Sequence, residues 1–370
     1  MTLTVHQAYN GCSRFSKNIL FSMSVSHKFV AGFALVLSLI TFEGSENALS
    51  KASLFSFDST VLPKAKQDSK TACLQRIKIA TVVTKDVKAT KQLYEDWLNH
   101  SVVEEGELSE AIANSWGTPK MAGKTYAILQ PESGDDVYLR IVEGTVPENY
   151  KAMTTHGWNA IELIVENPDS IYKKLLESPF MHLGGPANLG DDGLSTIRAV
   201  QFKGPSEEVF YFTRDKGDPL KSTLLTPRSP IDRPFIMVLA GSDARTLTDF
   251  YVSNFGVKEA FFLKIPIPLV ATAQNLATKH EFPLSLVRLR DFSNSIEIDG
   301  YPSIAGPRPT PKSELPPGVA MASFTVDNLD LINSDLFIGS PKKLFGAGYN
   351  GNRAATIKGP AGELIELIEE

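Results

Sequence analysis

The chain has 370 residues, of which 42% are hydrophobic and 21% charged, and its formal net charge is −5. This composition is that of a globular protein with roughly two to three domains. The slightly acidic balance provides no basic face for nucleic acid, so we expect no nucleic-acid partner. Cys12 and Cys73 are the two cysteines, which excludes a cysteine-based metal centre and CxxC redox chemistry.

Near the N-terminus, residues 29–42 form an uncharged apolar run, FVAGFALVLSLITF, that follows His27 and Lys28. The run is short for a bilayer span and typical of the hydrophobic region of a secretory signal. Ala48-Leu49-Ser50 provides a small-x-small cleavage site. We expect a periplasmic or secreted protein without stable membrane insertion after cleavage; an uncleaved anchor is the alternative.

Composition divides the chain into five segments. Residues 1–50 hold the signal peptide and the segment before it, and residues 51–71 form a polar, aperiodic tether. Residues 72–216 and 233–370 are two folded parts of similar length. Residues 217–232 are a proline-rich linker between them.

Two modules in different halves share the same internal spacing. In the first module, a strand residue precedes a turn aspartate by seven positions, and a helix tyrosine follows eight positions later. These residues are Ile79, Asp86 and Tyr94, and the third module repeats both intervals with Ile236, Asp243 and Tyr251. Apolar residues around each tyrosine recur with helical periodicity.

The other two modules form a second matching pair. Ala160 to Asn167 and Met321 to Asn328 again span seven positions, and each asparagine precedes an apolar stretch expected to be a helix. Both modules close with a Gly-Pro turn before a glutamate, GPSEE from Gly204 and GPAGE from Gly359. Repetition at this scale predicts units that bury their faces against copies of themselves.

Tandem strand-helix-strand modules with this Gly-Pro-x-Gly-Glu turn resemble the vicinal oxygen chelate superfamily of glyoxalases, bleomycin-resistance proteins and extradiol dioxygenases. The resemblance covers residues 72–370. It implies an α+β fold of four tandem βαβββ modules forming two half-open β-barrel domains, with modules 1 and 2 in the first and modules 3 and 4 in the second. This fold supports many reactions and also non-catalytic binding, so it does not fix the function.

The same resemblance implies a divalent metal held by the first and last strands of the modules. The first-strand positions here are Ile79, Ala160, Ile236 and Met321, none of which binds such an ion. The last-strand positions are Arg140, Tyr211, Glu297 and Glu366. We therefore expect no cofactor. Glu297 and Glu366 are the remaining candidate metal ligands, and a vestigial or structural role is their alternative.

Strand alternation indicates which polar side chains enter the barrels. Arg140 and Tyr138 share one face of the segment VYLRIVE, and Glu162 shares the inward direction of Ala160. We expect Arg140 to anchor an anion, Glu162 to act as general base and Tyr211 to donate a hydrogen bond to a carbonyl or enolate oxygen. The alternative is structural: a buried Arg140–Glu162 ion pair and a packed tyrosine. Substrate contacts are expected from Tyr138, Thr81 and His156.

Together these patterns predict an exported, metal-independent isomerase, epimerase or lyase that removes a proton from a small oxygenated molecule. A non-catalytic small-molecule binding protein, similar to bleomycin-resistance proteins, is the alternative reading. A metal-dependent dioxygenase or glyoxalase is the third. The sequence leaves open whether the chain is an enzyme and whether it forms a homodimer.

Overall fold

The computed structural model describes residues 72–189 and 195–370. The expected signal peptide, its cleavage site and the tether therefore lie outside the described residues. Within the described part, no helix has the length and apolar character needed to cross a membrane.

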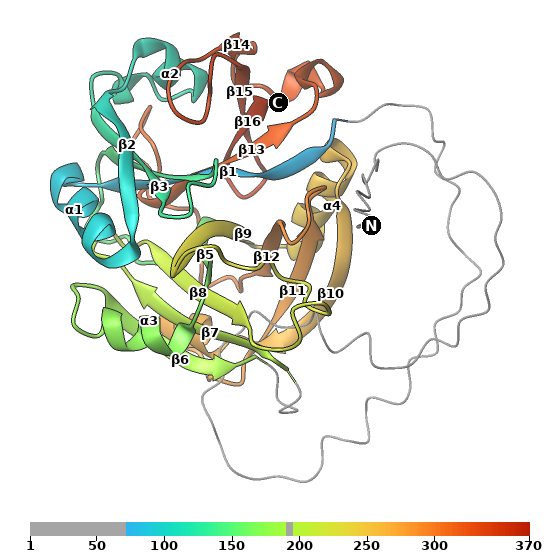
Figure 1. Ribbon diagram of the computed structural model, residues 1–370. Coiled ribbons are helices and arrows are strands. Elements are labelled where there is room, and N and C mark those ends of the chain that lie inside the picture. The colour runs from blue at the N-terminus through green and yellow to red at the C-terminus, as the bar shows by residue number, and fades with distance from the viewer. Residues whose placement is uncertain (1–71, 190–194) are drawn as a thin grey trace, which may run out of the picture.

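Sixteen strands and a few short helices follow the four-module order (Figure 1). Module 1 consists of β1 (Leu74–Thr84), α1 (Val87–Leu98), β2 (His100–Glu107), α2 (Glu110–Ser115), the 3-10 turn η1 (Pro119–Met121), β3 (Thr125–Pro131) and β4 (Tyr138–Glu143). Module 2 consists of β5 (Gly157–Val165), α3 (Pro168–Leu175), β6 (Met181–Asn188), β7 (Ile197–Lys203) and β8 (Val209–Asp215).

The second half repeats this order. Module 3 consists of β9 (Ile231–Gly241), α4 (Ala244–Phe255), β10 (Lys258–Pro266), α5 (Pro268–Ala273), β11 (Glu281–Arg288) and β12 (Ser295–Gly300). Module 4 consists of β13 (Gly318–Val326), the 3-10 turns η2 (Leu329–Leu331) and η3 (Ser334–Leu336), β14 (Lys342–Lys343), β15 (Arg353–Lys358) and β16 (Leu364–Glu369).

The expected pairing of the modules is wrong. One eight-stranded sheet has the order β14-β15-β16-β13-β1-β4-β3-β2, so module 1 pairs with module 4; the other has the order β10-β11-β12-β9-β5-β8-β7-β6, so module 2 pairs with module 3. We call these curled sheets barrel 1/4 and barrel 2/3. Both seams are antiparallel first-strand pairs, β1 with β13 and β5 with β9. The α+β architecture of four modules in two barrel-like domains is confirmed. Each barrel combines one module from the first half of the sequence with one from the second.

The helix starts agree with the turn residues found in the sequence. Asp86 caps α1 by accepting a hydrogen bond from the Ala89 amide at 2.9 Å, and Asp243 caps α4 through the Arg245 amide at 2.9 Å. The helix expected in module 4 is replaced by the turns η2 and η3. The backbone is extended at Ile332, which ends the first of these turns. Asn333 then caps the second, so no helix propagates through the segment.

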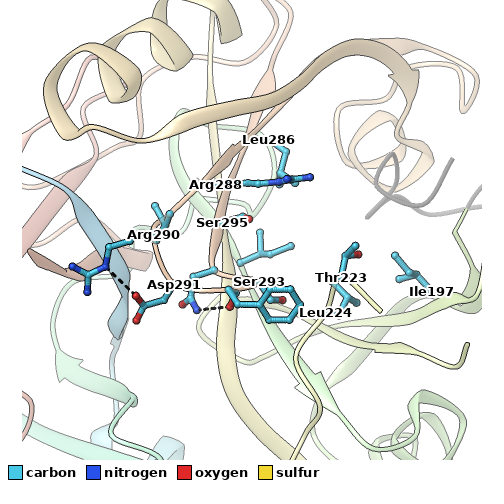
Figure 2. Close-up of a pocket in the computed structure, with 13 residues that line it drawn as sticks. Ile197, Thr223, Leu224, Leu286, Arg288, Arg290, Asp291, Ser293 and Ser295 are labelled. Carbon is cyan, nitrogen blue, oxygen red and sulfur yellow. Dashed lines mark hydrogen bonds and ion pairs between the residues drawn. The ribbon is translucent and has the colours of Figure 1, made fainter. Parts of the chain in front are cut away.

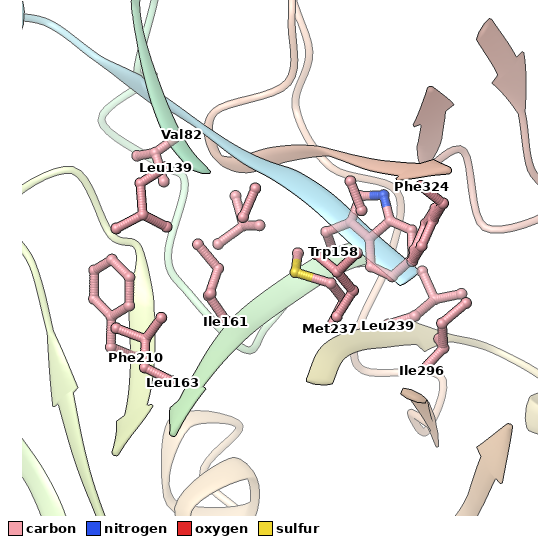
Figure 3. Close-up of a cluster of buried hydrophobic side chains, with 14 of the residues drawn as sticks. Val82, Leu139, Trp158, Ile161, Leu163, Phe210, Met237, Leu239, Ile296 and Phe324 are labelled. Carbon is pink, nitrogen blue, oxygen red and sulfur yellow. The ribbon is translucent and has the colours of Figure 1, made fainter. Parts of the chain in front are cut away.

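A continuous apolar core joins the two barrels (Figure 3). Side chains alternate along each strand, so one set lines a barrel and the next set lies in this shared core. On β1, Ile79 belongs to the cluster inside barrel 1/4, whereas Ala80 and Val82 belong to the shared core. Trp158 of β5 lies in that core, and its indole N–H donates to the Leu364 carbonyl of β16 at 2.8 Å.

Two tyrosine–glutamate hydrogen bonds also link the barrels, one in each half of the sequence. Tyr94 of α1 donates to Glu208 at 3.0 Å, and Tyr251 of α4 donates to Glu363 at 3.2 Å. Both glutamates end the Gly-Pro turns noted in the sequence and are buried. Each bond joins a helix of one barrel to a turn of the other, so the recurrence of the helix tyrosine and of the turn glutamate has a structural cause.

Candidate active site

The centre of barrel 1/4 holds a buried ion pair. Arg140 of β4 meets Glu366 of β16 at 2.9 Å, and their side chains are 1% and 0% exposed. Both carboxylate oxygens have further donors: Ser323 at 2.5 Å, Tyr349 at 2.6 Å and Trp116 at 2.6 Å. Burial alone would raise the pKa of Glu366, but Arg140 and these hydrogen bonds hold it below its usual value.

The guanidinium of Arg140 is equally well satisfied. It donates to the Thr81 hydroxyl at 3.0 Å and the Tyr349 hydroxyl at 2.7 Å, and its carbon atom lies 4.4 Å from the centre of the Trp116 ring. Glu366 thus occupies the position at which Arg140 would bind the anion of a ligand. The expected role of Arg140 as a substrate anchor is not supported, and its expected partner Glu162 is wrong, because Glu162 lies in the other barrel.

The interior of barrel 2/3 holds buried acidic side chains in place of an ion pair. Glu162 of β5 is fully buried, and its neighbour on β8 in the register is Tyr211. One carboxyl oxygen accepts a hydrogen bond from Thr213, whereas Oε2 has no partner in the part of the chain that the structure describes. Burial raises the pKa of Glu162 to about 8, although the Thr213 hydrogen bond acts in the opposite direction. Glu162 and Tyr211 therefore lie together as the sequence predicted, without Arg140.

Two further carboxyl groups enter the same interior from β12. Glu297 and Asp299 are each 1% exposed, and Glu297 Oε1 and Asp299 Oδ1 have no hydrogen-bond partner among residues 72–189 and 195–370. Burial raises the pKa of both groups, and Asp299 and then Glu162 raise that of Glu297 further. Asp299 did not emerge from the sequence. Its position two residues after Glu297, on the same face of the strand, was the available signal.

Tyr211 is held in its protonated form. Burial raises its pKa well above the usual value, and Glu297, Asp299 and Glu162 add to the shift in that order. The pKa of Tyr301 is also raised well above its usual value, first by burial and then by Asp299 and Tyr211. Both hydroxyls are therefore hydrogen-bond donors in an interior of carboxyl groups.

A cavity of about 250 Å³ opens at one end of barrel 2/3 (Figure 2). Its wall is mainly apolar, with Arg288 and the β11–β12 hairpin at the mouth. Ile236 and Ser295 also line it. Ile236 is the cross-strand neighbour of Glu162, and Ser295 precedes Glu297 by two residues on the same face. Glu162 and Glu297 are therefore neighbours of lining residues, and they do not line the cavity themselves.

The three expected substrate contacts do not surround this cavity. Thr81 is buried in barrel 1/4 as an acceptor for Arg140, and the Tyr138 hydroxyl donates to Asp136 at 2.8 Å. His156 lines a different cavity, of about 150 Å³, beside Arg308. Burial and then Arg308 lower the pKa of His156. Because these groups belong to barrel 1/4 or to the seam between the barrels, they cannot form one site with Glu162.

Two solved structures share this architecture. Glyoxalase I from Zea mays matches with a TM-score of 0.52 and 12% identity, over 80% of this chain and 92% of that chain. A putative dioxygenase from Bacillus subtilis subsp. subtilis str. 168 matches with a TM-score of 0.52 and 11% identity, over 80% of this chain and 86% of that chain. The protein has the vicinal oxygen chelate fold. No family model and no curated protein matches the sequence.

In this chain the side chains do not fit the divalent metal that the resemblance implied. The two remaining candidate ligands are separated, since Glu366 lies in barrel 1/4 and Glu297 in barrel 2/3, so they cannot share an ion. Glu366 already forms an ion pair with Arg140. Among the described residues, no group of three or more His, Cys, Asp or Glu side chains is arranged to hold a metal ion.

Proposed function

We propose that barrel 2/3 binds a small oxygenated molecule and that Glu162 moves a proton on it, in an isomerase, epimerase or lyase reaction. The observation that carries this proposal is the buried Glu162 carboxyl, whose Oε2 has no partner among the described residues and whose pKa is raised to about 8. A base with a pKa near the working pH combines basicity with a usable ionised fraction. Such perturbed groups next to a cavity are frequent at catalytic sites.

The proposed step is proton abstraction next to a carbonyl. The ionised Glu162 takes the proton, the C–H bond breaks, and its electron pair forms an enolate. Tyr211 donates a hydrogen bond to the developing oxyanion. Return of the proton to another face or carbon completes an isomerisation or epimerisation, and loss of a β-substituent completes an elimination. Glu162 is the cross-strand neighbour of Ile236, which lines the cavity, so the proposed base lies beside the cavity wall.

The test uses hydrogen exchange, which reports proton abstraction whatever the product is. Small α-hydroxy ketones and oxo acids are screened for binding by ligand-observed NMR, and each bound compound is incubated with the protein in D2O. Wild-type protein should exchange the carbon-bound proton of at least one compound. Glu162→Gln should bind that compound with similar affinity and lose the exchange.

A matched control separates the cavity from the base. Thr223 lines the cavity from a half-buried loop position, so Thr223→Trp should block binding and exchange together without disturbing a strand. Binding to wild type without exchange of any bound compound would refute the catalytic proposal. It would favour the second candidate, a non-catalytic binding protein, which the mainly apolar wall of the cavity supports. Stoichiometric metal in the purified protein would favour the third.

We also propose that the protein is exported, on the basis of the apolar run at residues 29–42. N-terminal sequencing of the full chain expressed in a bacterium tests this proposal. Cleavage near Ser50 and recovery from the periplasm or medium are the expected results. A full-length cytoplasmic product would contradict export.

A further inference from the structure

We propose that the ligand of barrel 2/3 carries a positively charged group, a primary ammonium or a guanidinium, which Glu297 and Asp299 receive. This inference rests on the proposed function, because it assigns a ligand class to the same barrel. It concerns the charge of the ligand and not the reaction.

The comparison of the two barrels is the first argument. Arg140 lies 61 positions after Ile79, and Glu297 lies 61 positions after Ile236, so the two occupy equivalent places in modules 1 and 3. In barrel 1/4 this place supplies a guanidinium, which pairs with the buried Glu366. In barrel 2/3 the same place supplies a carboxyl group. At this place one barrel therefore has a buried cation, whereas the other has a buried carboxyl group.

The second argument is the state of those acceptors. Glu162 Oε2, Glu297 Oε1 and Asp299 Oδ1 are buried and have no hydrogen-bond partner within the described residues. No ion pair among those residues involves any of the three side chains. Buried carboxyl groups in proteins are almost always paired, because an unpaired one loses its hydration without compensation. An incoming cation with several N–H donors would provide partners for the Glu297 and Asp299 oxygens and leave Glu162 as the base.

Geometry favours an organic cation over a metal ion. Metal ligands must converge on one point at short distances, and the described side chains here do not. An ammonium or guanidinium has donors spread over a larger volume and also attracts aromatic rings. Tyr211 and Tyr301 lie in the field of the same carboxyl groups. At the mouth, Arg290 is already paired with Asp291 at 3.3 Å.

The test compares benzylamine, benzyl alcohol and benzoate, which share one ring and differ in charge. Binding is measured at neutral pH by calorimetry or NMR titration. Both the full-length protein and the protein lacking residues 1–50 are used. Benzylamine should bind roughly tenfold tighter than benzyl alcohol, and benzoate weakest, because a hydrogen bond between charged groups exceeds a neutral one by that order. The double variant Glu297→Gln, Asp299→Asn should remove the preference.

An exposed glutamate on β11 provides the matched control, since Glu281→Gln should keep the preference. Equal or tighter binding of benzyl alcohol would overturn the charge assignment while leaving the proposed small-molecule site intact. Failure of all three compounds to bind would count against both proposals. Displacement of benzylamine by micromolar Mg²⁺, Ca²⁺, Mn²⁺ or Zn²⁺ would show that the carboxyl groups serve a metal, and it would overturn the assignment.

Discussion

Arg140 and Glu366 are 226 positions apart in the chain, and their side chains meet at 2.9 Å inside barrel 1/4. Removing one member of such a pair leaves a buried charge without a partner, which typically costs about 3–5 kcal/mol. We therefore expect Arg140→Leu to lower the free energy of unfolding by that amount. Urea denaturation followed by circular dichroism measures the effect.

The double variant Arg140→Leu, Glu366→Leu is the informative control. It removes both charges and fills the space with apolar side chains, so it should recover most of the lost stability. Neither variant should alter ligand affinity in barrel 2/3, because the pair lies in the other barrel. A double variant as unstable as the single one, or a loss of binding in a folded variant, would contradict a purely structural role.

The two tyrosine–glutamate links predict a pH dependence of stability. Burial raises the pKa of Glu208 and of Glu363 to about 7, although the hydrogen bonds each carboxyl accepts act in the opposite direction. When folding raises the pKa of a carboxyl group, that group stabilises the folded state at pH values below its unfolded-state pKa. This stabilisation is lost as the pH rises to the folded-state pKa. These two carboxyls should therefore weaken the fold progressively between about pH 4.5 and pH 7.

The double variant Glu208→Gln, Glu363→Gln isolates this effect from the other titrating groups. The difference in unfolding free energy between wild type and variant should change across that pH range by up to about 3 kcal/mol for each site. Glu281→Gln, at an exposed position, should show no such change. A difference that stays constant from pH 4 to pH 8 would mean that both carboxyls keep their ordinary titration.

The proposed catalytic base gives a second pH prediction. Because Glu162 must be ionised to accept a proton, kcat/KM should rise with pH and level off above its pKa of about 8. The rate of proton exchange in D2O for a bound compound, measured from pH 6 to pH 10, provides the profile. Inflection near pH 4.5 would show that Glu162 is an ordinary exposed carboxylate in solution, or that another group is the base.

The intertwined sheets predict how fragments behave. Residues 72–216 contain modules 1 and 2, which belong to different sheets and lack their partners' first strands. This fragment alone should show no cooperative unfolding and a poorly dispersed NMR spectrum. Mixing it with residues 217–370 should restore cooperative unfolding. A stable, well-dispersed 72–216 fragment would require modules 1 and 2 to pair with each other, contrary to the observed registers.

The sequence predicted the modules well because each module is specified locally. Spacing between a strand, a turn residue such as Asp86 and a helix tyrosine is set within one unit, so repeats reveal it directly. Pairing between units is not local. β1 can present the same edge to either first strand, and the choice of β13 depends on contacts between residues more than 200 positions apart, such as Ile77 with Phe324. The placement of Arg140 away from Glu162 follows from this choice.

The site was predicted as far as strand alternation reaches. Alternation placed Arg140, Glu162, Tyr211, Glu297 and Glu366 on inward faces, where the structure has them buried. It could not assign them to a common interior. Asp299 was overlooked because no motif marks it. In module 4 the apolar stretch after Asn328 predicts a helix, but Asn333 begins a new turn within it.

The order of strands in barrel 1/4 also constrains how the protein is made. On the ribosome, β1 emerges among the first strands, whereas the strand it pairs with, β13, begins at Gly318. Module 1 must therefore remain incomplete, with an open strand edge, until β13 of module 4 has been translated. Modules 2 and 3 can close their own sheet earlier, and the two ends of the chain then assemble beside it.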